Sequence, residues 1–344
     1  MKNQTTYKDA GVDIDTADST KKSMEESLQT SDQRVLHRHG SFAALFEASF
    51  PGILNPVLVL KAEEPGSKQL LAFEHGFVRE ICFDLINHLI NDIIVMGARP
   101  LAVLDTIVCG ELKKDVILQL VKGISEACKL HDCSLVGGET SEQPRVLDKG
   151  RHVLCATVMG VVEKSKIVDG SKIQEGDLVL ALPSSGPHTN GYTLIRTLIE
   201  RRPEILKERI GERTFLQAIM EPHRSYYKPL TGIFEIPGLT GLAHITGGGI
   251  QGNLNRILPQ NLSAEIDLSC IRVPEIFRFI QKAAGAPSDD MLRTFNMGVG
   301  MCVVCRSEAQ GSITAALREH GCDAYAIGRV MSGTGDVRCF GALG

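Results

Sequence analysis

Short apolar segments with strand character alternate with helical segments along the whole chain, and this alternation restricts the fold to sheets packed against helices. In the first half, the pattern predicts strands at 56–61, 101–109, 134–136 and 153–163, and helices at 20–36, 81–96 and 115–130. In the second half, it predicts strands at 178–182, 264–268, 298–305 and 324–330, and helices at 192–201, 224–234, 274–284 and 309–320. Residues 165–176 interrupt the pattern with two glycines, so we place a domain boundary there.

The length and composition are typical of a two-domain enzyme. A chain of 344 residues with 43% hydrophobic residues exceeds the size that one hydrophobic core normally reaches. We expect an N-terminal domain over residues 1–167 and a C-terminal domain over residues 168–344. The net charge of −4 and the 5% aromatic content offer neither electrostatic attraction nor stacking surfaces for nucleic acid. Small molecules are therefore the expected partners.

Neither an export signal nor a membrane span is predicted. Residues 1–31 are polar and lack the apolar core of a signal peptide, and the chain has no long uncharged apolar run. The ten cysteines are scattered through apolar segments, which favours reduced, buried thiols in a cytoplasmic protein. Cys302 and Cys305 lie three apart on a predicted strand and therefore point to opposite faces, which disfavours a shared metal.

The segment 184–191, Ser-Ser-Gly-Pro-His-Thr-Asn-Gly, connects a predicted strand to a predicted helix. The unpaired N–H groups and the positive dipole end of a helix start can hold phosphate. His188 adds a group that titrates near neutral pH. The segment therefore predicts an anion site with acid–base chemistry. The alternative is an ordinary helix cap, in which Thr189 or Asn190 satisfies the N–H groups and His188 is exposed.

The predicted helix 81–96 is apolar nearly all round, yet four polar side chains share one of its faces. Asp84, His88, Asn91 and Asp92 are spaced by four, seven and eight residues. Mg²⁺ prefers oxygen ligands and is usually held by one or two carboxylates together with phosphate oxygens. The stripe thus suits a Mg²⁺–nucleotide site, and a buried polar network or a solvent-facing stripe is the alternative.

Two further segments combine consecutive glycines with the end of a predicted strand, at 136–142 and at 245–249. Glycines let a backbone approach a ligand closely, and their N–H groups can form an anion nest. We expect both segments to be ligand-binding turns. Among the remaining histidines, His244 precedes the Thr-Gly-Gly-Gly turn, and two alternatives stay open for it: a second site residue or, as is more common after an apolar strand, a structural histidine. The following four are expected to be solvated: His131, His152, His223 and His320.

Six segments resemble, in this order, the signatures of the phosphoribosylformylglycinamidine cyclo-ligase (aminoimidazole ribonucleotide synthetase) family. They are residues 7–15, 133–140, 161–165, 184–192, 244–249 and 293–301. The resemblance implies an α+β subunit of two domains, with mixed sheets packed against helices and a homodimer formed through the N-terminal sheet. It also implies that ATP phosphorylates the formyl oxygen of formylglycinamidine ribonucleotide, an amidine nitrogen attacks the activated carbon, and phosphate leaves as 5-aminoimidazole ribonucleotide forms.

The resemblance also assigns site residues by position. Catalytic roles fall to His188 and Asn190. Nucleotide binding falls to Lys68, Asp84, Asn91, Asp92, Gly137, Gly138 and Glu139. Substrate binding falls to Ser185, Gly186, Thr246, Gly247, Gly248 and Gly249. Mg²⁺ is assigned to Asp84, Asp92 and Glu63, and ATP is the implied cosubstrate.

Departures from the family pattern concentrate at the nucleotide and metal elements of the N-terminal domain. Residues 62–68 read Ala-Glu-Glu-Pro-Gly-Ser-Lys in place of Thr-Asp-Gly-Val-Gly-Thr-Lys, and residues 37–43 replace a glycine-rich stretch by His-Arg-His-Gly-Ser-Phe-Ala. Residues 106–112 and 142–145 also differ. Two alternatives therefore stay open: a diverged ATP-dependent cyclase or ligase for another amide or amidine, and a non-catalytic binding partner.

Overall fold

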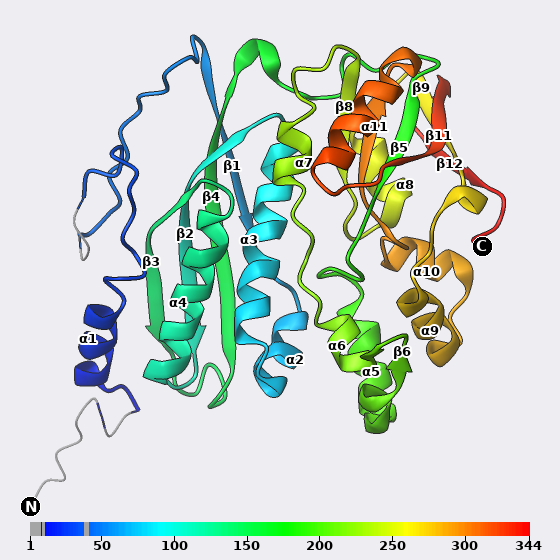
Figure 1. Ribbon diagram of the computed structural model, residues 1–344. Coiled ribbons are helices and arrows are strands. Elements are labelled where there is room, and N and C mark those ends of the chain that lie inside the picture. Colours follow the sequence, from blue (N-terminus) through cyan, green and yellow to red (C-terminus); the bar gives the residue numbers. More distant parts are fainter. Residues whose placement is uncertain (1–7, 9–10, 38–40) are drawn as a thin grey trace, which may run out of the picture. The chain divides into compact units, whose positions relative to one another are not determined.

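The computed structural model describes residues 8, 11–37 and 41–344, and within them the chain forms two compact units, each built on its own sheet (Figure 1). The N-terminal unit comprises Met1–Ile90 and Arg99–Lys164, and the C-terminal unit comprises Asn91–Ala98 and Ser165–Gly344. Of the segments singled out in the sequence, Tyr7, Asp9, Ala10 and residues 38–40 lie outside the described residues. The expected combination of mixed sheets and helices is confirmed.

The sheet of the N-terminal unit has the strand order β1-β4-β2-β3. Its strands are β1 (Pro56–Glu63), β2 (Arg99–Cys109), β3 (Ser134–Glu142) and β4 (His152–Glu163). Strand β4 pairs antiparallel with β1 and β2, whereas β2 and β3 run parallel and are joined through a helix. One face of the sheet buries Val103, Ile107 and Leu154, and the other leaves Leu58 and Leu60 exposed.

The helices of the N-terminal unit are α1 (Ile14–Ser23), α2 (Lys68–His75), α3 (Val78–Ile94) and α4 (Lys114–Lys129). Helix α3 buries side chains over most of its circumference, as its nearly continuous apolar sequence predicts. It packs closely against α4, where a Cβ on Gly123 would lie 3.0 Å from Cys82 Sγ. The last residues of α3, from Asn91 onward, belong to the C-terminal unit.

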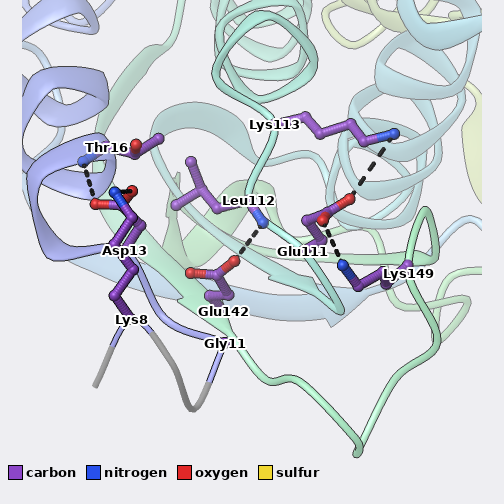
Figure 2. A pocket seen from close by; sticks show the side chains of 9 residues that line it. All are labelled: Lys8, Gly11, Asp13, Thr16, Glu111, Leu112, Lys113, Glu142 and Lys149. Carbon is purple, nitrogen blue, oxygen red and sulfur yellow. Dashed lines mark hydrogen bonds and ion pairs between the residues drawn. The ribbon is translucent and has the colours of Figure 1, made fainter. Parts of the chain in front are cut away.

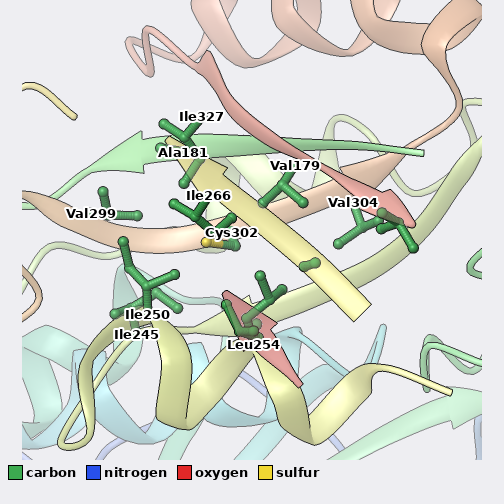
Figure 3. Packing of buried hydrophobic residues seen from close by; sticks show 14 of the residues in the cluster. Val179, Ala181, Ile245, Ile250, Leu254, Ile266, Val299, Cys302, Val304 and Ile327 are labelled. Carbon is green, nitrogen blue, oxygen red and sulfur yellow. The ribbon is translucent and has the colours of Figure 1, made fainter. Parts of the chain in front are cut away.

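A six-stranded sheet of order β12-β9-β11-β5-β10-β8 organises the C-terminal unit. Its strands are β5 (Leu178–Pro183), β8 (Leu239–His244), β9 (Leu262–Asp267), β10 (Val299–Cys305), β11 (Tyr325–Ser332) and β12 (Val337–Phe340). Adjacent strands are antiparallel except β12 and β9. Figure 3 shows Ile250 and Leu254 packed against apolar side chains of this sheet, including Cys302 and Val304.

The other elements of the C-terminal unit surround this sheet. Its helices are α5 (Tyr192–Arg201), α6 (Phe215–Ile219), α7 (Tyr227–Thr231), α8 (Gly249–Leu254), α9 (Glu275–Ala284), α10 (Ser288–Thr294) and α11 (Gln310–Glu319). A small ribbon pairs β6 (Arg209–Ile210) with β7 (Arg213–Thr214). The 3₁₀ turns of the chain are Lys164–Lys166, Pro203–Lys207, Asn255–Ile257, Leu268–Cys270 and Ser307–Ala309.

Most predicted elements are confirmed within a few residues, and three predictions are wrong. The helix expected at 20–36 begins and ends earlier, because the Asp13 side chain accepts a hydrogen bond from Thr16 N–H and caps α1 there. The helix expected at 224–234 shrinks to α7, because upstream backbone groups bond to a side chain instead of to a helical neighbour. The strand expected at 134–136 continues to Glu142, so residues 137–139 do not form a turn.

The ten thiols are less uniformly buried than the sequence indicated, because Cys270 is exposed and Cys155 and Cys339 are half-buried. All ten cysteines lie among the described residues and are free thiols, and burial raises the pKa of Cys302 to about 12. Cys302 and Cys305 sit on the single strand β10. Within the described part of the chain, no helix combines the length and the apolar character that crossing a bilayer requires.

Three histidines expected to be solvated, His131, His152 and His223, are buried instead. His152 lies at the start of β4, with its ring centroid 4.7 Å from that of Phe73. Burial lowers the pKa of His152. The neutral imidazole is therefore the form that the fold favours.

We predict that replacing His152 by phenylalanine makes the fold less sensitive to acid. A lowered folded-state pKa means that the unfolded chain binds the proton first, so this histidine destabilises the native state as the pH falls below about 6.5. Urea unfolding of both proteins between neutral pH and mildly acidic pH measures the effect. The difference in unfolding free energy should grow in favour of His152→Phe on acidification; a pH-independent difference would contradict the assignment.

Candidate functional site

His188 lies at the centre of the turn between β5 and α5 and is buried, with 1% of its surface exposed. Its backbone adopts φ 59°, a left-handed conformation that non-glycine residues seldom take. Ser185 N–H donates to His188 Nε2 at 3.2 Å, so a neutral ring carries its proton on Nδ1. An ordinary helix cap with an exposed histidine is thereby excluded.

Asn296, in the loop between α10 and β10, holds this turn in place. Its side-chain oxygen accepts from Ser184 Oγ at 3.0 Å and from Gly298 N–H at 2.8 Å, and its amide donates to Gly186 carbonyl at 2.9 Å. Ser185 Oγ in turn donates to the Pro222 carbonyl at 2.7 Å. Asn296 was not predicted as a site residue, although it lies in the segment 293–301 that carries the family resemblance.

His188 belongs to a line of three buried histidines that ends at the half-buried Asp92. The rings of His188 and His223 are stacked, with centroids 3.9 Å apart. His223 Nε2 lies 2.9 Å from His244 Nε2, and His244 Nδ1 lies 2.7 Å from Asp92 Oδ1. All four residues belong to the C-terminal unit. The sequence missed His223, because its only local signal is a histidine beside proline and arginine.

The Thr246–Gly249 turn is organised by Asn253, which is buried on α8. Asn253 Nδ2 donates to the carbonyls of Gly247 at 3.1 Å and Gly249 at 2.8 Å. Gly248 N–H and Gly249 N–H donate to carbonyls of the protein, so these two groups do not form the anion nest that the sequence predicted. Glycine is required at 249 because its φ is 63° and a Cβ would lie 1.9 Å from the Leu292 carbonyl.

The two remaining polar candidates of the C-terminal unit, Asn190 and Asn91, have different surroundings. A Cβ on Gly247 would lie 3.2 Å from Asn190 Oδ1, so Asn190 brings the histidine turn beside the glycine turn. Asn91 Nδ2 donates to the Arg224 carbonyl at 2.8 Å, and Asn91 Oδ1 accepts from Tyr226 N–H at 2.9 Å. Asn91 therefore fixes the loop that carries His223.

In the N-terminal unit, Lys68 and Asp84 form an ion pair whose side chains are both fully buried. Lys68 Nζ lies 2.9 Å from Oδ1 and 2.7 Å from Oδ2 of Asp84. A buried carboxylate needs such a partner, because burial of an isolated charge is very costly. Asp84 thus commits both oxygens to an ammonium group, which is a poor arrangement for a Mg²⁺ ligand.

A second carboxylate, Asp105, lies in the middle of β2 and was not predicted. It is buried, and burial raises its pKa to about 7, opposed only by a hydrogen bond to its own backbone. A lone acid inside the apolar strand 101–109 is the sequence signal that would have identified it. Functional sites are where such perturbed acids concentrate.

Asp105 shares one row of the sheet with Glu63. The strand register pairs Glu63 with Ala156, Ala156 with Asp105, and Asp105 with Gly138. Paired residues point to the same face, so two carboxylates flank a small alanine on that face, about 10 Å apart at their Cα atoms. Glu63 Oε2 also lies 3.0 Å from Lys61 Nζ and 3.8 Å from His88 Nε2.

The segment Gly137, Gly138 and Glu139 does not form the ligand-binding turn that its glycines suggested. It lies within β3, the edge strand of the sheet, and Glu139 is exposed there. Gly138 is needed for another reason, because a Cβ would overlap the carboxylate of Asp105. This glycine therefore makes room for the buried acid of the neighbouring strand.

A cavity of about 380 Å³ lies elsewhere in the N-terminal unit (Figure 2). It is lined by Lys8, Gly11, Asp13, Thr16, Glu111, Leu112, Lys113, Glu142 and Lys149. Its three lysines face three acids, and Lys8 Nζ and Lys149 Nζ lie 2.6 Å from Asp13 and 2.9 Å from Glu111. These neutralised pairs give the cavity little net attraction for a phosphate group.

Comparison with known proteins gives full-length matches. The family models for the N-terminal and C-terminal domains of AIR synthase related proteins match residues 66–162 and 174–339. The phosphoribosylformylglycinamidine cyclo-ligase of Neisseria meningitidis serogroup C is 39% identical over 338 residues, which cover 98% of each chain. That of Chromobacterium violaceum is 40% identical over 331 residues, 96% of each chain.

Solved structures with much lower identity share the fold. The hydrogenase maturation protein HypE of E. coli superposes with a TM-score of 0.68 at 18% identity, covering 94% of each chain. A HypE structure in complex with ATP gives a TM-score of 0.63 at 20% identity, covering 87% of this chain and 84% of that one. Both comparisons support the two-sheet α+β architecture.

The unfolding free energy of the native protein should fall as the pH rises, because Asp105 becomes charged while buried. We predict that Asp105→Asn abolishes this fall. A folded-state pKa raised to about 7 means that the neutral carboxyl stabilises the fold at low pH, and that this contribution is lost progressively up to neutral pH. In metal-free buffer at pH 8, the variant should be more stable by up to about 4 kcal/mol. Urea unfolding at pH 5 and pH 8 measures this; equal differences at both values would refute it.

Proposed function

The chain belongs to the phosphoribosylformylglycinamidine cyclo-ligase family, and we propose on this basis that it closes the imidazole ring of 5-aminoimidazole ribonucleotide. It is an ATP-dependent ligase of purine biosynthesis that forms a C–N bond. The observation that carries this conclusion is the identity of about 40% with cyclo-ligases over nearly the whole of both chains. The signature segments of the C-terminal unit come together around His188, which supports the same conclusion.

The reaction requires the transfer of a phosphoryl group and the transfer of a proton. The γ-phosphoryl group of ATP passes to the formyl oxygen of formylglycinamidine ribonucleotide, an amidine nitrogen then attacks the activated carbon, and phosphate leaves while the nitrogen loses a proton. His188 is suited to hold the transferring phosphoryl group or to move this proton, since it is buried and its Nδ1 carries a hydrogen in the neutral ring. Asn190 lies between the histidine turn and the glycine turn and is proposed to orient the substrate.

Substrate phosphate and ribose are proposed to bind along the two turns of the C-terminal unit. These turns contain Ser185, Gly186 and residues 246–249. Their shape is imposed by Asn296, which bonds to Ser184 and Gly186, and by Asn253, which donates to the carbonyls of Gly247 and Gly249. Because both asparagines are buried and fully surrounded, the turns are held in place before a ligand arrives, which reduces the entropy lost on binding.

The nucleotide and Mg²⁺ are proposed to bind the N-terminal unit. Only some of the carboxylates predicted as Mg²⁺ ligands are suited to hold the ion. Asp105 and Glu63 are the carboxylates that would hold Mg²⁺, because a cation offsets the cost of burying the Asp105 charge. The predicted ligands Asp84 and Asp92 are engaged by Lys68 and His244. Bound Mg²⁺ would neutralise phosphate charge during transfer. Lys68 and Asp84 would then act by shaping the floor of the site.

The altered loop 62–68 is compatible with this proposal. Glu64 is exposed, and its Oε2 accepts from Gln69 Nε2 at 3.3 Å, so its charge is directed toward solvent and its own loop. Glu63 lies on the same face of the sheet as Asp105, with Ala156 between them. ATP is the nucleotide of one HypE structure of the same fold, which supports nucleotide binding by this chain.

A homodimer is proposed to form through the open face of the N-terminal sheet. We define this open face by the exposed apolar side chains of Leu58, Leu60, Leu104 and Val153. They lie on β1, β2 and β4, three adjacent strands. A contiguous apolar sheet face on a folded protein indicates an interaction surface.

The low aromatic content and the charge balance favour small molecules over nucleic acid, and the supply of ATP favours the cytoplasm.

The first test of function is turnover of formylglycinamidine ribonucleotide with MgATP, following ADP and the aminoimidazole product together. His188→Asn is the informative variant, because asparagine tolerates the left-handed backbone that His188 adopts. We expect turnover to fall by about 10²–10⁴-fold with an unchanged unfolding midpoint. The exposed His320, replaced by glutamine, is the matched control and should keep full activity.

ADP release without the aminoimidazole product would favour a ligase for another amide or amidine. Absence of both from a folded protein would favour a non-catalytic binding partner. Full activity in His188→Asn would remove His188 from the chemistry and leave the assignment of the reaction intact.

We further predict that Leu60→Lys weakens dimerisation. Each leucine buried in an interface contributes about 1.5–3 kcal/mol, so its loss in both copies should raise the dissociation constant at least about tenfold. Sedimentation velocity at several concentrations measures this. Leu130→Lys is the control, because Leu130 is similarly exposed but lies at the end of α4, outside the open face. Equal dissociation constants in the two variants would place the dimer contact elsewhere.

A further inference from the structure

The line of His188, His223 and His244 has a property that cyclo-ligation does not require. One ring nitrogen of each histidine lies within 4.8 Å of the ring nitrogens of the other two. The three residues are 1%, 1% and 6% exposed, and they come from three separate segments of the C-terminal unit. We propose that these imidazoles form a binding site for a divalent transition-metal ion of the Zn²⁺, Co²⁺ or Ni²⁺ class, with Asp92 as the supporting carboxylate.

The contact between His223 and His244 has dimensions suited to a metal. An ion bonded about 2.0–2.1 Å from each of two nitrogens that lie 2.9 Å apart would subtend an angle of about 90° between them. This is the angle between neighbouring ligands in octahedral and square-planar sites, and a slight outward turn of either ring reaches the tetrahedral value. The two Nε2 atoms are therefore spaced as a pair of neighbouring ligands, and both offer a lone pair to a metal once neutral His223 moves the hydrogen of this contact from Nε2 to Nδ1.

Asp92 completes the arrangement that histidine ligands usually have. His244 donates its Nδ1–H to Asp92 Oδ1 at 2.7 Å, so in the neutral ring Nε2 carries the lone pair that faces His223. Metal-binding histidines commonly donate their second ring N–H to a carboxylate, which orients the ring and increases its basicity. Asp92 thus orients the His244 ring without contacting the metal itself.

The loop that carries His223 is held rigidly. Asn91 bonds to the backbone at Arg224 and Tyr226, directly after this histidine. The guanidinium of Arg224 donates to the carbonyls of Pro183 and Gly321. Its positive charge is therefore directed to backbone oxygens. Preorganised ligands of this kind lower the entropy lost on metal binding.

His188 contributes the third ligand by turning its ring. It is stacked on His223 with an angle of 21° between the ring planes, and its Nε2 accepts from Ser185 N–H, so binding a metal requires His188 to give up this hydrogen bond. The χ2 torsion of histidine is broad, and a turn about it directs one nitrogen of His188 toward the pair. Gly300 leaves space beside the ring, because a Cβ there would lie 2.9 Å from His188 Cε1.

The donor set determines the class of ion. Three imidazole nitrogens suit Zn²⁺, Ni²⁺, Cu²⁺ or Co²⁺, whereas Mg²⁺ takes oxygen ligands and keeps several waters. The site is therefore distinct in chemistry from the carboxylate row of the N-terminal unit. If His188 acts in catalysis as proposed above, occupancy by a transition metal removes it from the reaction and inhibits turnover; metal binding itself does not depend on that proposal.

The test measures Co²⁺ binding to the full-length, untagged protein in the presence of excess Mg²⁺. We expect one tightly bound Co²⁺ per chain, visible absorption bands typical of nitrogen ligands, and displacement by Zn²⁺. His223→Gln keeps a polar side chain of similar reach and should weaken binding by more than the roughly 10–100-fold that loss of an outer carboxylate costs. His320→Gln should bind as the wild type does.

Asp92→Asn is the second variant, in case His223→Gln does not fold, and should weaken Co²⁺ binding by about 10–100-fold. Circular dichroism and thermal melts establish that each variant is folded. Binding that is unchanged in both variants, or an oxygen-only Co²⁺ spectrum, overturns the proposal. Zn²⁺ inhibition of turnover, reversed by a chelator, tests the link to His188 separately: tight binding without inhibition keeps the metal site and rejects the catalytic role.

Discussion

The C-terminal unit depends on the hydrogen bonds made by two consecutive residues at the end of α3. Asn91 fixes the backbone on either side of Ser225, and Asp92 orients His244 at the end of β8. Both are polar groups taken largely out of water, so each bond lost would leave a buried donor or acceptor unsatisfied. The His223 loop, the β8 terminus and, through ring stacking, the His188 turn all take their positions from this pair.

Asparagine side chains repeat this role at the two signature turns. Asn253 donates to the carbonyls of Gly247 and Gly249, whereas Asn296 donates to the Gly186 carbonyl and accepts from Ser184 Oγ and Gly298 N–H. An amide offers donors and an acceptor at fixed angles, so one side chain can hold a backbone that has left regular secondary structure. The left-handed conformation at His188 persists because its surroundings are fixed in this way.

The buried carboxylates of the N-terminal unit differ in how their charge is compensated. Lys68 neutralises Asp84 inside the protein, whereas Asp105 is buried with only its own backbone as an aid and has a raised pKa as a result. Helical spacing and the family resemblance both assigned Asp84 to Mg²⁺, together with Asp92 and Glu63, and neither contains the buried ion pair with Lys68. The strand register instead aligns Glu63 with Asp105 across small residues, which is an arrangement that no local pattern contains.

The sequence by itself determined most of the longer elements, their order and the family. Apolar periodicity located β1, α3, α4, β5 and α5, because burial of one face is written in the spacing of apolar residues. Signature segments identified the chemistry. Only the tertiary structure decided which polar residues meet. His223 has no distinctive neighbours in sequence, and Asp105 stands out only as a lone acid in an apolar strand. The roles of both arise from contacts between segments far apart in the chain, whose geometry depends on how the sheets and loops pack.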